Sequence, residues 1–412
     1  MTSGQVHTSI QDWESRQQRG PGSAPVKIGI FHPTNWPHVR RGTERFMNEL
    51  AAYLAQRGHE VTIVCGTPGR PEVVRDRGYL TRYRRSLWRP SLARLGILDY
   101  HVFPLTTVRA LLRERFDVVH CFGFTDALVA SWLSRLSGAR VILHLTSIPP
   151  SVRYRRSVTT GGRLVRRAIH AADLVLTVSQ SQQRYFERYG REILAMPVPV
   201  DTEAFPLALA RNHAQPTIVC ASALEDPRKG GRLLMRAFNR LKQTRPAVRL
   251  AISSQVGDAL REALLALVDE RWRRDVRFFG AGELSDLPAM LGSASVVVVP
   301  SLWEAFSMVL LEALATGTPV VATRDGGSEE IIRPRVGRTF EPGPPDIAEP
   351  SNVEGLAEAL AVTLDLSRRP ETAHECRARA ERFAWSALGP RFEDIYLRVL
   401  GRARADRIVE EP

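Results

Sequence analysis

The feature that most constrains the fold of this chain is a repeated alternation of short apolar runs with helical patterns. Strands of parallel sheets that are covered on both faces read as continuous apolar runs. We therefore expect parallel α/β sheets, with helices such as Glu44–Gln56, which Gly58 would stop, and Leu233–Leu241 between the strands. The predicted strands are Val26–Phe31, Val61–Cys65, Val118–His120, Val141–Leu145, Leu174–Val178, Thr217–Cys220, Leu250–Ser253, Val276–Phe279, Val296–Val299 and Val320–Ala322.

The strands fall into two series, separated by the proline-rich stretch Met196–Asp201 and by polar residues up to Pro216. A chain of 412 residues exceeds one ordinary core. We expect two Rossmann-like domains, 25–203 and 210–382, that face each other across a cleft, since such sheets bind ligands at the carboxyl ends of their strands. Residues 383–405 carry aromatic residues on a helical period and predict a terminal helix that packs back on the first domain.

Cysteine usage and apolar patterning bear on the compartment. The four cysteines, Cys65, Cys121, Cys220 and Cys376, are far apart, and no Cys-x-x-Cys spacing occurs. A disulfide framework or a zinc site is therefore not expected. Residues 1–24 are polar and lack the apolar core of a secretory signal, so we interpret them as a flexible tail. No run of 18 apolar residues occurs, and we expect a cytoplasmic protein.

The net charge of +13 comes almost wholly from arginine, because Lys27, Lys229 and Lys242 are the only lysines. Arginine usage typical of a high-GC bacterial genome is one explanation, and attraction to anions is another. No nucleic-acid-binding module is evident, so nucleic acid is not an expected partner.

The segment from Pro300 to Gly317 is the densest in chemistry-bearing residues. A strand would end at Pro300, a loop would carry Glu304, and a helix would begin near Ser307 and contain Glu312. Two acids eight residues apart could span about 12 Å if the stretch were wholly helical, which is about the reach from a sugar ring to a nucleotide ribose. Carboxylates accept hydrogen bonds from vicinal hydroxyls. The alternative is a solvent-facing Glu304 and a Glu312 on the helix surface.

Backbone amides at the start of that helix would lie between the two acids. The amides of Ala305, Phe306, Ser307, Met308 and Val309 are candidates to hold a diphosphate, because helix N-termini bind anions.

With its surroundings, this segment resembles the Glu-x7-Glu motif of the retaining glycosyltransferases of family 4, which have the GT-B fold. The segments Val276–Gly280, Gly317–Ala322 and Gly326–Ile332 follow the order of that family. The resemblance covers about residues 26–400. It implies that Glu304 contacts the transferred sugar and that Glu312 binds the ribose hydroxyls of a nucleotide diphosphate sugar, the expected donor.

A second cluster, Asp226–Gly231, follows the strand that ends at Cys220. The family usually has a Gly-Arg pair directly after this strand and a Lys-Gly pair later, and both cations hold the diphosphate. Lys229-Gly230 matches, whereas Ser222-Ala223 stands where Gly-Arg is usual. We interpret Lys229 as catalytic and Arg228 as a substitute for the missing cation, because cations there stabilise the charge that develops on bond cleavage. A solvated loop is the alternative.

On the first domain the family pattern is weaker. Gly42 matches one of two glycines that usually approach the donor at a helix start. His120 matches the first position of a His-x-His strand end, but Phe122 occupies the second. His144 and Thr146 end the next strand and are acceptor-side candidates. For His120, interpreted as catalytic, and for His144, the alternative is a hydrogen-bonded core histidine.

Two arginine-rich stretches, 77–115 and 153–167, lie in the first half of the chain. Tyr83, Leu87 and Trp88 interleave with the first of them. We interpret the stretches as solvated loops over the cleft, and contact with a membrane surface or an anionic acceptor as the alternative.

Together these observations predict a hexosyltransferase, and the resemblance implies that it works without a metal. It needs no cofactor beyond the donor and transfers a hexosyl group to an acceptor hydroxyl, with a small core such as an aminocyclitol as the acceptor. The alternatives are a glycolipid or polysaccharide mannosyl- or glucosyltransferase, a nucleotide-sugar epimerase on the same fold, and a non-catalytic binding protein. Neither the oligomeric state nor the donor base follows from the sequence.

Overall fold

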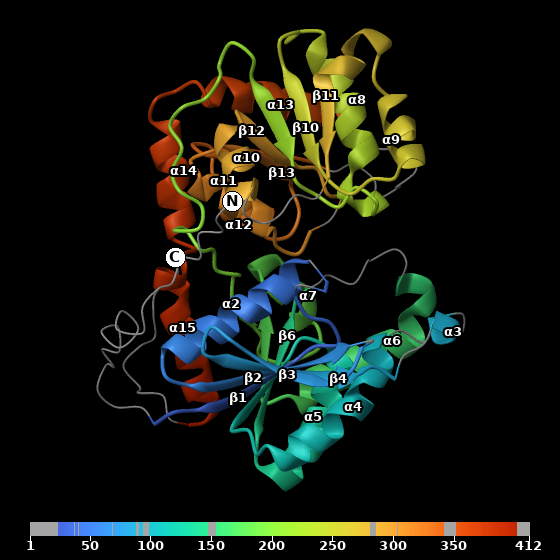
Figure 1. The fold of residues 1–412 in the computed structure, drawn as a ribbon, viewed down its shortest axis with the longest axis vertical. Helices are drawn as coiled ribbons and strands as arrows, with labels where there is room; N and C mark the ends of the chain where they lie inside the picture. Colours follow the sequence, from blue (N-terminus) through green and yellow to red (C-terminus); the bar gives the residue numbers. More distant parts are fainter. Residues whose placement is uncertain are drawn as a thin grey trace, which may run out of the picture. The chain divides into compact units, whose positions relative to one another are not determined.

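The computed structural model describes residues 24–401 except 37, 40, 68, 88–89, 94–98, 147–153, 281–285, 303 and 342–351 (Figure 1). The predicted tail therefore lies outside the described residues, apart from Ala24, and so does Trp88. The chain forms two compact units. The first contains the chain up to His144, Gly162–Val175 and the described residues from Glu393; the second contains Leu145–Gly161 and Leu176–Phe392. The predicted domain limits and the predicted cleft between the domains stay predictions.

The first sheet has the strand order β3-β4-β2-β1-β5-β6-β7-β8. Its pairs β2–β4, β1–β2, β1–β5, β5–β6 and β7–β8 are parallel, and β3–β4 is antiparallel. Its strands are β1 (Lys27–Phe31), β2 (Glu60–Thr67), β3 (Glu72–Asp76), β4 (Tyr79–Arg85), β5 (Val118–Cys121), β6 (Arg140–Leu145), β7 (Leu174–Thr177) and β8 (Leu194–Ala195). Its helices are α2 (Gly42–Gln56), α3 (Pro90–Ala93), α4 (Asp99–Arg113), α5 (Phe124–Ser137), α6 (Tyr154–Ala171) and α7 (Gln180–Glu187).

The second sheet has the order β11-β10-β9-β12-β13-β14, and all of its pairs are parallel. Its strands are β9 (Thr217–Cys220), β10 (Arg249–Ser253), β11 (Val276–Phe279), β12 (Val296–Val299), β13 (Val320–Thr323) and β14 (Gly337–Phe340). The helices are α8 (Gly231–Lys242), α9 (Asp258–Leu265), α10 (Leu287–Ser293), α11 (Met308–Ala315), α12 (Ser328–Ile331), α13 (Val353–Leu366) and α14 (Thr372–Glu381), with 3-10 turns η1 (Pro227–Lys229) and η2 (Glu270–Asp275). Helices α8 and α13 pack together over buried β9, β10 and β12 side chains.

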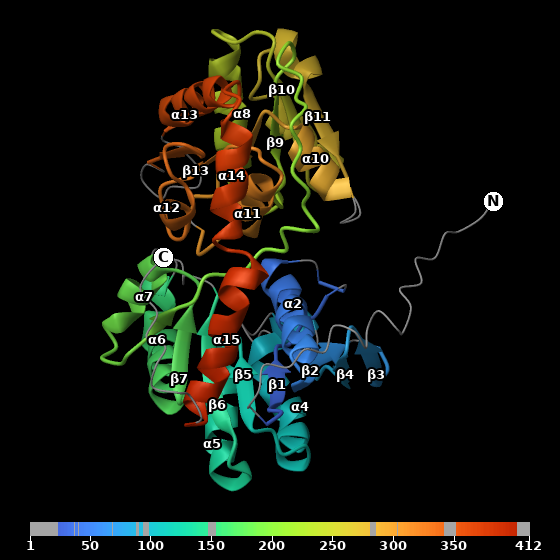
Figure 2. The same cartoon turned by 90° about the vertical axis from the view of Figure 1, so that its left-hand side faces the viewer.

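The last helix, α15 (Trp385–Val399), begins in the second unit, and its final turns belong to the first (Figure 2). Glu393 anchors these turns, because its carboxylate accepts a hydrogen bond from Arg57 at 3.0 Å and lies 3.5 Å from His59. The prediction of a terminal helix that returns to the first domain is confirmed.

Each predicted strand is present within one or two residues of its expected limits. The interpretation of the arginine-rich stretches as loops is wrong, because they contain β4, α4 and most of α6. In β4 the side chains of Tyr79, Thr81 and Tyr83 are buried and alternate with more exposed ones, a period of two that the arginines obscured. Tyr83 is thus a core residue and no surface aromatic.

The cysteines and the apolar character of the helices were also considered in the sequence, and both can be compared with the structure. All four cysteines are free and buried, and burial raises the pKa of the Cys220 thiol to about 12. None of the helices in the described part of the chain is both long and apolar enough to cross a bilayer.

Candidate active site

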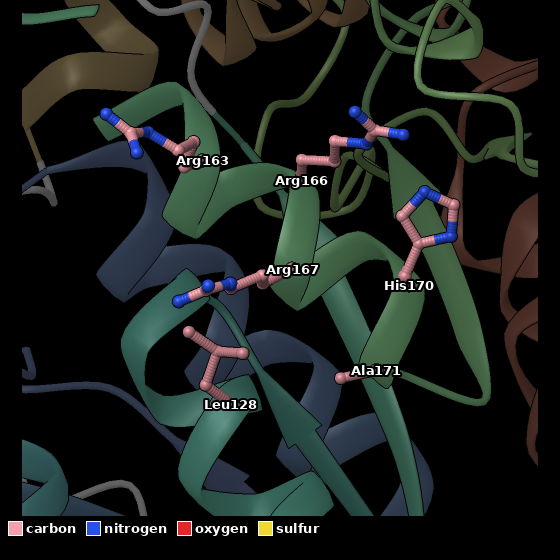
Figure 3. Close-up of a pocket in the computed structure, with 6 residues that line it drawn as sticks. All are labelled: Leu128, Arg163, Arg166, Arg167, His170 and Ala171. Atoms are coloured by element: carbon pink, nitrogen blue, oxygen red, sulfur yellow. The ribbon is translucent and has the colours of Figure 1, made fainter. Parts of the chain in front are cut away.

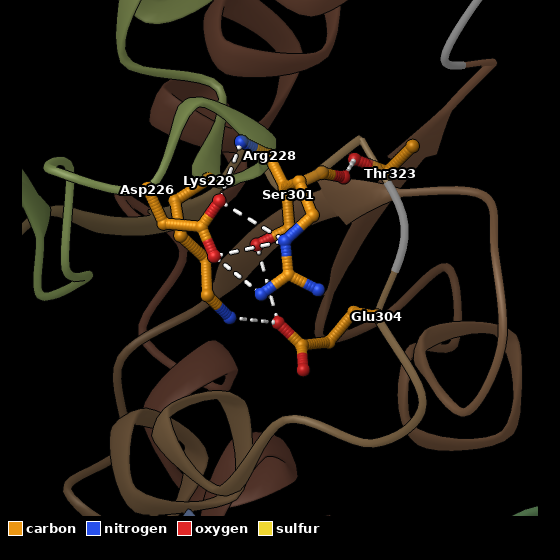
Figure 4. Close-up of polar contacts among 6 residues, drawn as sticks. All are labelled: Asp226, Arg228, Lys229, Ser301, Glu304 and Thr323. Carbon is orange, nitrogen blue, oxygen red and sulfur yellow. Dashed lines mark hydrogen bonds and ion pairs between the residues drawn. The ribbon is translucent and has the colours of Figure 1, made fainter. Parts of the chain in front are cut away.

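Lys229 and Glu304 meet where two neighbouring strands of the second sheet end. Lys229 closes the η1 turn after β9, and Glu304 lies in the loop after β12. The Lys229 ammonium donates to Glu304 Oε2 at 2.6 Å, and the Ser301 hydroxyl donates to the same oxygen at 3.2 Å (Figure 4). The two side chains are 28% and 24% exposed, so a ligand can reach both. The structure brings together these two residues as the sequence predicts.

Close backbone packing holds the Glu304 loop. At Gly230, φ is +72°, and a Cβ there would overlap the carbonyl oxygen of Pro300. Leu302 N–H donates to the Arg228 carbonyl at 2.7 Å, which ties the loop to the η1 turn. At Gly326, φ is +58°, and a Cβ would overlap the carbonyl oxygen of Glu304. Only glycine tolerates both the positive φ and the close contact at these two positions. The two glycines therefore determine how closely the Glu304 loop packs against the neighbouring backbone.

Asp325 supports the same loop from the other side. Its carboxyl group lies close to the backbone of Gly326 and Glu304. Burial raises the pKa of Asp325, and the neighbouring backbone of these two residues opposes that rise. The segment 326–332 belongs to the family resemblance, but nothing in its sequence predicts its contact with Glu304.

Helix α11 begins at Met308, with Ser307 as its N-cap and no side-chain hydrogen bond to the cap. The first amides of a helix have no partner within it, so Met308 and Val309, both half-buried, present N–H groups at this end. Ala305 and Phe306 are buried, and the Ala305 carbonyl accepts from Gly327 N–H at 2.9 Å. The predicted helix start and its position beside Glu304 are confirmed.

Glu312 lies in the middle of α11 and is 1% exposed. The alternative of a helix-surface Glu312 is therefore wrong. Its neighbours in the helix, Met308–Ala315, are otherwise apolar. Burial of a carboxylate costs free energy that an apolar residue would not, so this position favours a functional reason for the acid.

Arg228 lies beside the Lys229–Glu304 pair, but its guanidinium is hydrogen-bonded to Asp226. Its guanidinium donates to Asp226 Oδ1 at 3.0 Å and to Oδ2 at 2.8 Å through Nε (Figure 4). That pairing raises the pKa of Arg228. The Arg228 side chain is 46% exposed, so it remains a candidate cation whose charge Asp226 offsets in part.

The residues predicted on the first sheet are more scattered. Gly42 is exposed and is the first residue of α2, after the N-cap Arg41. Thr146 is half-buried and follows β6.

His120 and His144 are fully buried side by side in the first unit. His120 Nδ1 is hydrogen-bonded to the Tyr396 hydroxyl of α15 at 2.6 Å, and its Nε2 to His144 Nδ1 at 3.2 Å. Phe122 stacks on the His120 ring with centroids 4.8 Å apart. Burial lowers the pKa of His120 to about 3 and lowers that of His144 well below its usual value. This geometry fits a pair of hydrogen-bonded core histidines, which was the alternative to a role in the reaction.

A second polar cluster, which sequence reasoning missed, lies where β1 and β5 end. Thr34 donates its hydroxyl to Glu44 at 2.7 Å, and its hydroxyl also lies 3.2 Å from His32 Nδ1. Burial raises the pKa values of Asp99 and Asp126 and lowers that of His32. The charge of Asp99 also acts on the pKa values of His32 and Asp126. The available signal was their position, because His32 directly follows β1 and because Glu44, Asp99 and Asp126 lie in the first turns of helices.

Comparison with known proteins finds glycosyltransferase sequences that match both halves of the chain. Residues 40–204 match the family described as "Glycosyltransferase Family 4", and residues 215–365 match "Glycosyl transferases group 1". An MMP α-(1→4)-mannosyltransferase of Mycolicibacterium hassiacum is 27% identical over 87% of this chain and 95% of its own length. A phosphatidyl-myo-inositol mannosyltransferase of Propionibacterium freudenreichii is 24% identical over 90% and 94%.

Solved structures extend the likeness to the fold. The sucrose-phosphate synthase of Thermosynechococcus elongatus superposes with a TM-score of 0.77 at 19% identity, over 91% of this chain and 99% of that one. An Anabaena protein solved in complex with UDP gives 0.67 at 18% identity, over 90% and 99%. Two parallel α/β sheets in this order, with a terminal helix shared between them, are the GT-B fold. Because the two matches together cover most of the sequence, the chain belongs to the family 4 glycosyltransferases.

Proposed function

We propose that the protein transfers a hexosyl group from a nucleotide diphosphate sugar to an acceptor hydroxyl with retention at the anomeric carbon. The ion pair of Lys229 with Glu304, beside the start of α11, carries this proposal. Lys229 and the amides of Met308 and Val309 would hold the diphosphate, and Glu304 would accept hydrogen bonds from sugar hydroxyls. Glu312 would bind the ribose.

In the proposed reaction the glycosidic bond to the donor phosphate breaks, and the acceptor oxygen bonds to the anomeric carbon on the same face. The acceptor proton passes to a phosphate oxygen of the leaving diphosphate. Lys229 and the helix-start amides stabilise the charge that develops on that diphosphate, with no metal required. Gly42 would let the α2 backbone approach the donor.

The acceptor is proposed to be a small polyol such as an aminocyclitol. The partly exposed members of the second polar cluster, His32 and Asp99, support this choice, because imidazole and carboxyl groups form hydrogen bonds with hydroxyl and ammonium groups. A glycolipid acceptor is the second candidate, since one relative is named for mannosyl transfer to phosphatidyl-myo-inositol. Product analysis with scyllo-inosamine and with phosphatidylinositol vesicles as acceptors separates the two.

A donor screen tests the donor half. UDP-, GDP-, ADP- and dTDP-sugars are compared by thermal shift, and the cognate donor at 100 times its Kd is expected to stabilise the fold by about 2.7 kcal/mol. Incubation with this donor alone separates transfer from epimerisation, because an epimerase would convert it without an acceptor. A chain that binds none of the donors would contradict the proposal and favour a binding protein.

Variants then test the residues. Lys229→Ala and Glu304→Gln are each expected to lower kcat/KM by about 10²–10³-fold, since they remove preorganised stabilisation of the leaving group and of the sugar. Arg274→Ala and Glu262→Gln change exposed residues of the same unit and serve as matched controls with unchanged rates. Addition of EDTA is expected to leave the rate unchanged, and normal rates in both site variants would refute the assignment.

We assign the protein to the cytoplasm. Four free, buried cysteines suit a reducing compartment, and separation of cell fractions with an antibody against the chain tests the assignment.

A further inference from the structure

Three helices, α4, α5 and α6, cover one face of the first sheet. The crossovers β4–α4–β5, β5–α5–β6 and β6–α6–β7 all progress in the same direction along the sheet, so right-handed connections put the three helices on one side. Helix α2 and the final turns of α15 lie on the opposite side (Figures 1 and 2). The outer surfaces of α4, α5 and α6 therefore form one layer that faces away from the sheet.

This layer exposes large apolar side chains. Leu105 and Leu112 of α4 are 66% and 47% exposed, and Trp132 and Leu136 of α5 are 65% and 76% exposed. Trp132 and Leu136 are four residues apart and thus lie on one stripe of α5. Because α4 packs beside α5, the two apolar stripes are neighbours.

The same layer is strongly basic. Exposed arginines occur on all three helices: Arg109, Arg113, Arg135, Arg163, Arg166 and Arg167. Asp99 at the start of α4 and the buried Asp126 are the only acids in the sequences of these three helices. The charge of this surface is therefore not offset by acids of the same helices.

Arginine and apolar groups meet where α5 and α6 join. A surface hollow there is lined by Leu128, Arg163, Arg166, Arg167, His170 and Ala171. Figure 3 shows the Arg167 side chain extended above Leu128, the residue one turn before Trp132 on the same stripe. The cations thus border the apolar stripe directly.

We propose that the outer surface of α4, α5 and α6 docks on the surface of an anionic phospholipid bilayer. Trp132 and Leu136 enter the headgroup region, and the arginines contact lipid phosphates. Nucleic acid would engage the arginines but leaves the four apolar side chains without a partner. A second copy of this chain would bring two arginine-rich surfaces together. The proposal does not depend on the proposed function, because binding is measured without donor or acceptor.

Co-sedimentation of the full chain with vesicles tests the proposal. We expect binding to phosphatidylcholine vesicles that contain phosphatidylglycerol, weak binding to phosphatidylcholine alone, and loss of binding as salt rises. The double variant Arg166→Glu/Arg167→Glu is expected to weaken binding by about tenfold or more. Arg274→Glu/Arg277→Glu changes two exposed arginines of the second unit by the same charge and is expected to bind like the parent.

A second pair of variants tests the apolar part. Trp132→Ala/Leu136→Ala is expected to weaken binding by about tenfold, whereas Leu209→Ala/Phe279→Ala, which removes exposed apolar side chains elsewhere, leaves it unchanged. Circular dichroism confirms that each variant is folded. Equal binding to neutral vesicles, equal losses in the control variants, or a dimer that Trp132→Ala/Leu136→Ala dissociates in the absence of vesicle binding would overturn the proposal.

Discussion

The Lys229–Glu304 pair and the His120–His144 pair differ in their access to solvent. Both sets lie near the carboxyl ends of parallel strands, and sequence reasoning gave a role in the reaction to members of both. Lys229 and Glu304 are about one quarter exposed and held in place by loops. His120 is fully buried, and both of its ring nitrogens are already hydrogen-bonded within the protein. A substrate can compete for the first pair, whereas contact with His120 requires the core to open.

The largest effect is expected from Gly326→Ala, which tests how the exposed pair is held. Alanine at φ +58° is strained, and its Cβ would overlap the Glu304 carbonyl oxygen. We expect a loss of about 3 kcal/mol or more in the free energy of unfolding, together with a large fall in transfer rate. Urea unfolding and steady-state kinetics measure both. Gly257→Ala, at a glycine with open space around its Cβ position, is the matched control, and equal behaviour of the two variants would contradict this account.

His120→Ala probes the buried pair. The variant leaves a cavity and removes the partner of the Tyr396 hydroxyl, which is itself fully buried. We expect a loss of about 2–3 kcal/mol in the free energy of unfolding and a near-normal rate per folded molecule. A stable variant with a rate lowered a hundredfold would instead give His120 the catalytic role predicted from the sequence.

The pH dependence of stability sharpens the same contrast. His120 has a pKa of about 3 in the folded protein and about 6.5 when unfolded, so between these values the unfolded chain binds a proton that the folded one does not. Stability is therefore lost as the pH falls below about 6.5, by about 1.4 kcal/mol per pH unit for this group.

His144 acts in the same direction, because its pKa is also lowered, and Asp126, whose pKa is raised, acts in the opposite direction. His120→Asn is expected to reduce the slope between pH 6 and pH 5, measured by urea unfolding against the parent. An unchanged slope would show that His120 is not held neutral.

The smallest effect is expected from Arg228→Ala. Since Asp226 already engages the guanidinium, this cation contributes less to the diphosphate than Lys229 does. We expect a three- to tenfold fall in kcat/KM. A loss as large as that of Lys229→Ala would mean that Arg228 leaves Asp226 when the donor binds.

The strands were predictable because continuous apolar runs of Val, Ile and Leu are typical of covered parallel sheets. The positions of Lys229 and Glu304 were predictable because both follow predicted strands, and α11 was predictable from its start near Ser307. β4 was missed because Arg82 and Arg84 alternate with its buried residues. The partner of His120 could not be predicted either, since Tyr396 lies 276 residues further along the chain. The contacts of Gly230 with Pro300 and of Gly326 with Glu304 depend on the packing of loops, which carries no local signal.

A double-mutant cycle on Lys229 and Glu304, with kcat/KM for transfer as the readout, tests the central claim most directly. If the pair acts on one donor, Lys229→Ala and Glu304→Gln each cost about 10²–10³-fold, and the double variant costs clearly less than the product of the two. The free energy of unfolding is expected to change by less than about 1 kcal/mol, because the pair is partly exposed. Near-normal transfer in either single variant would contradict the account.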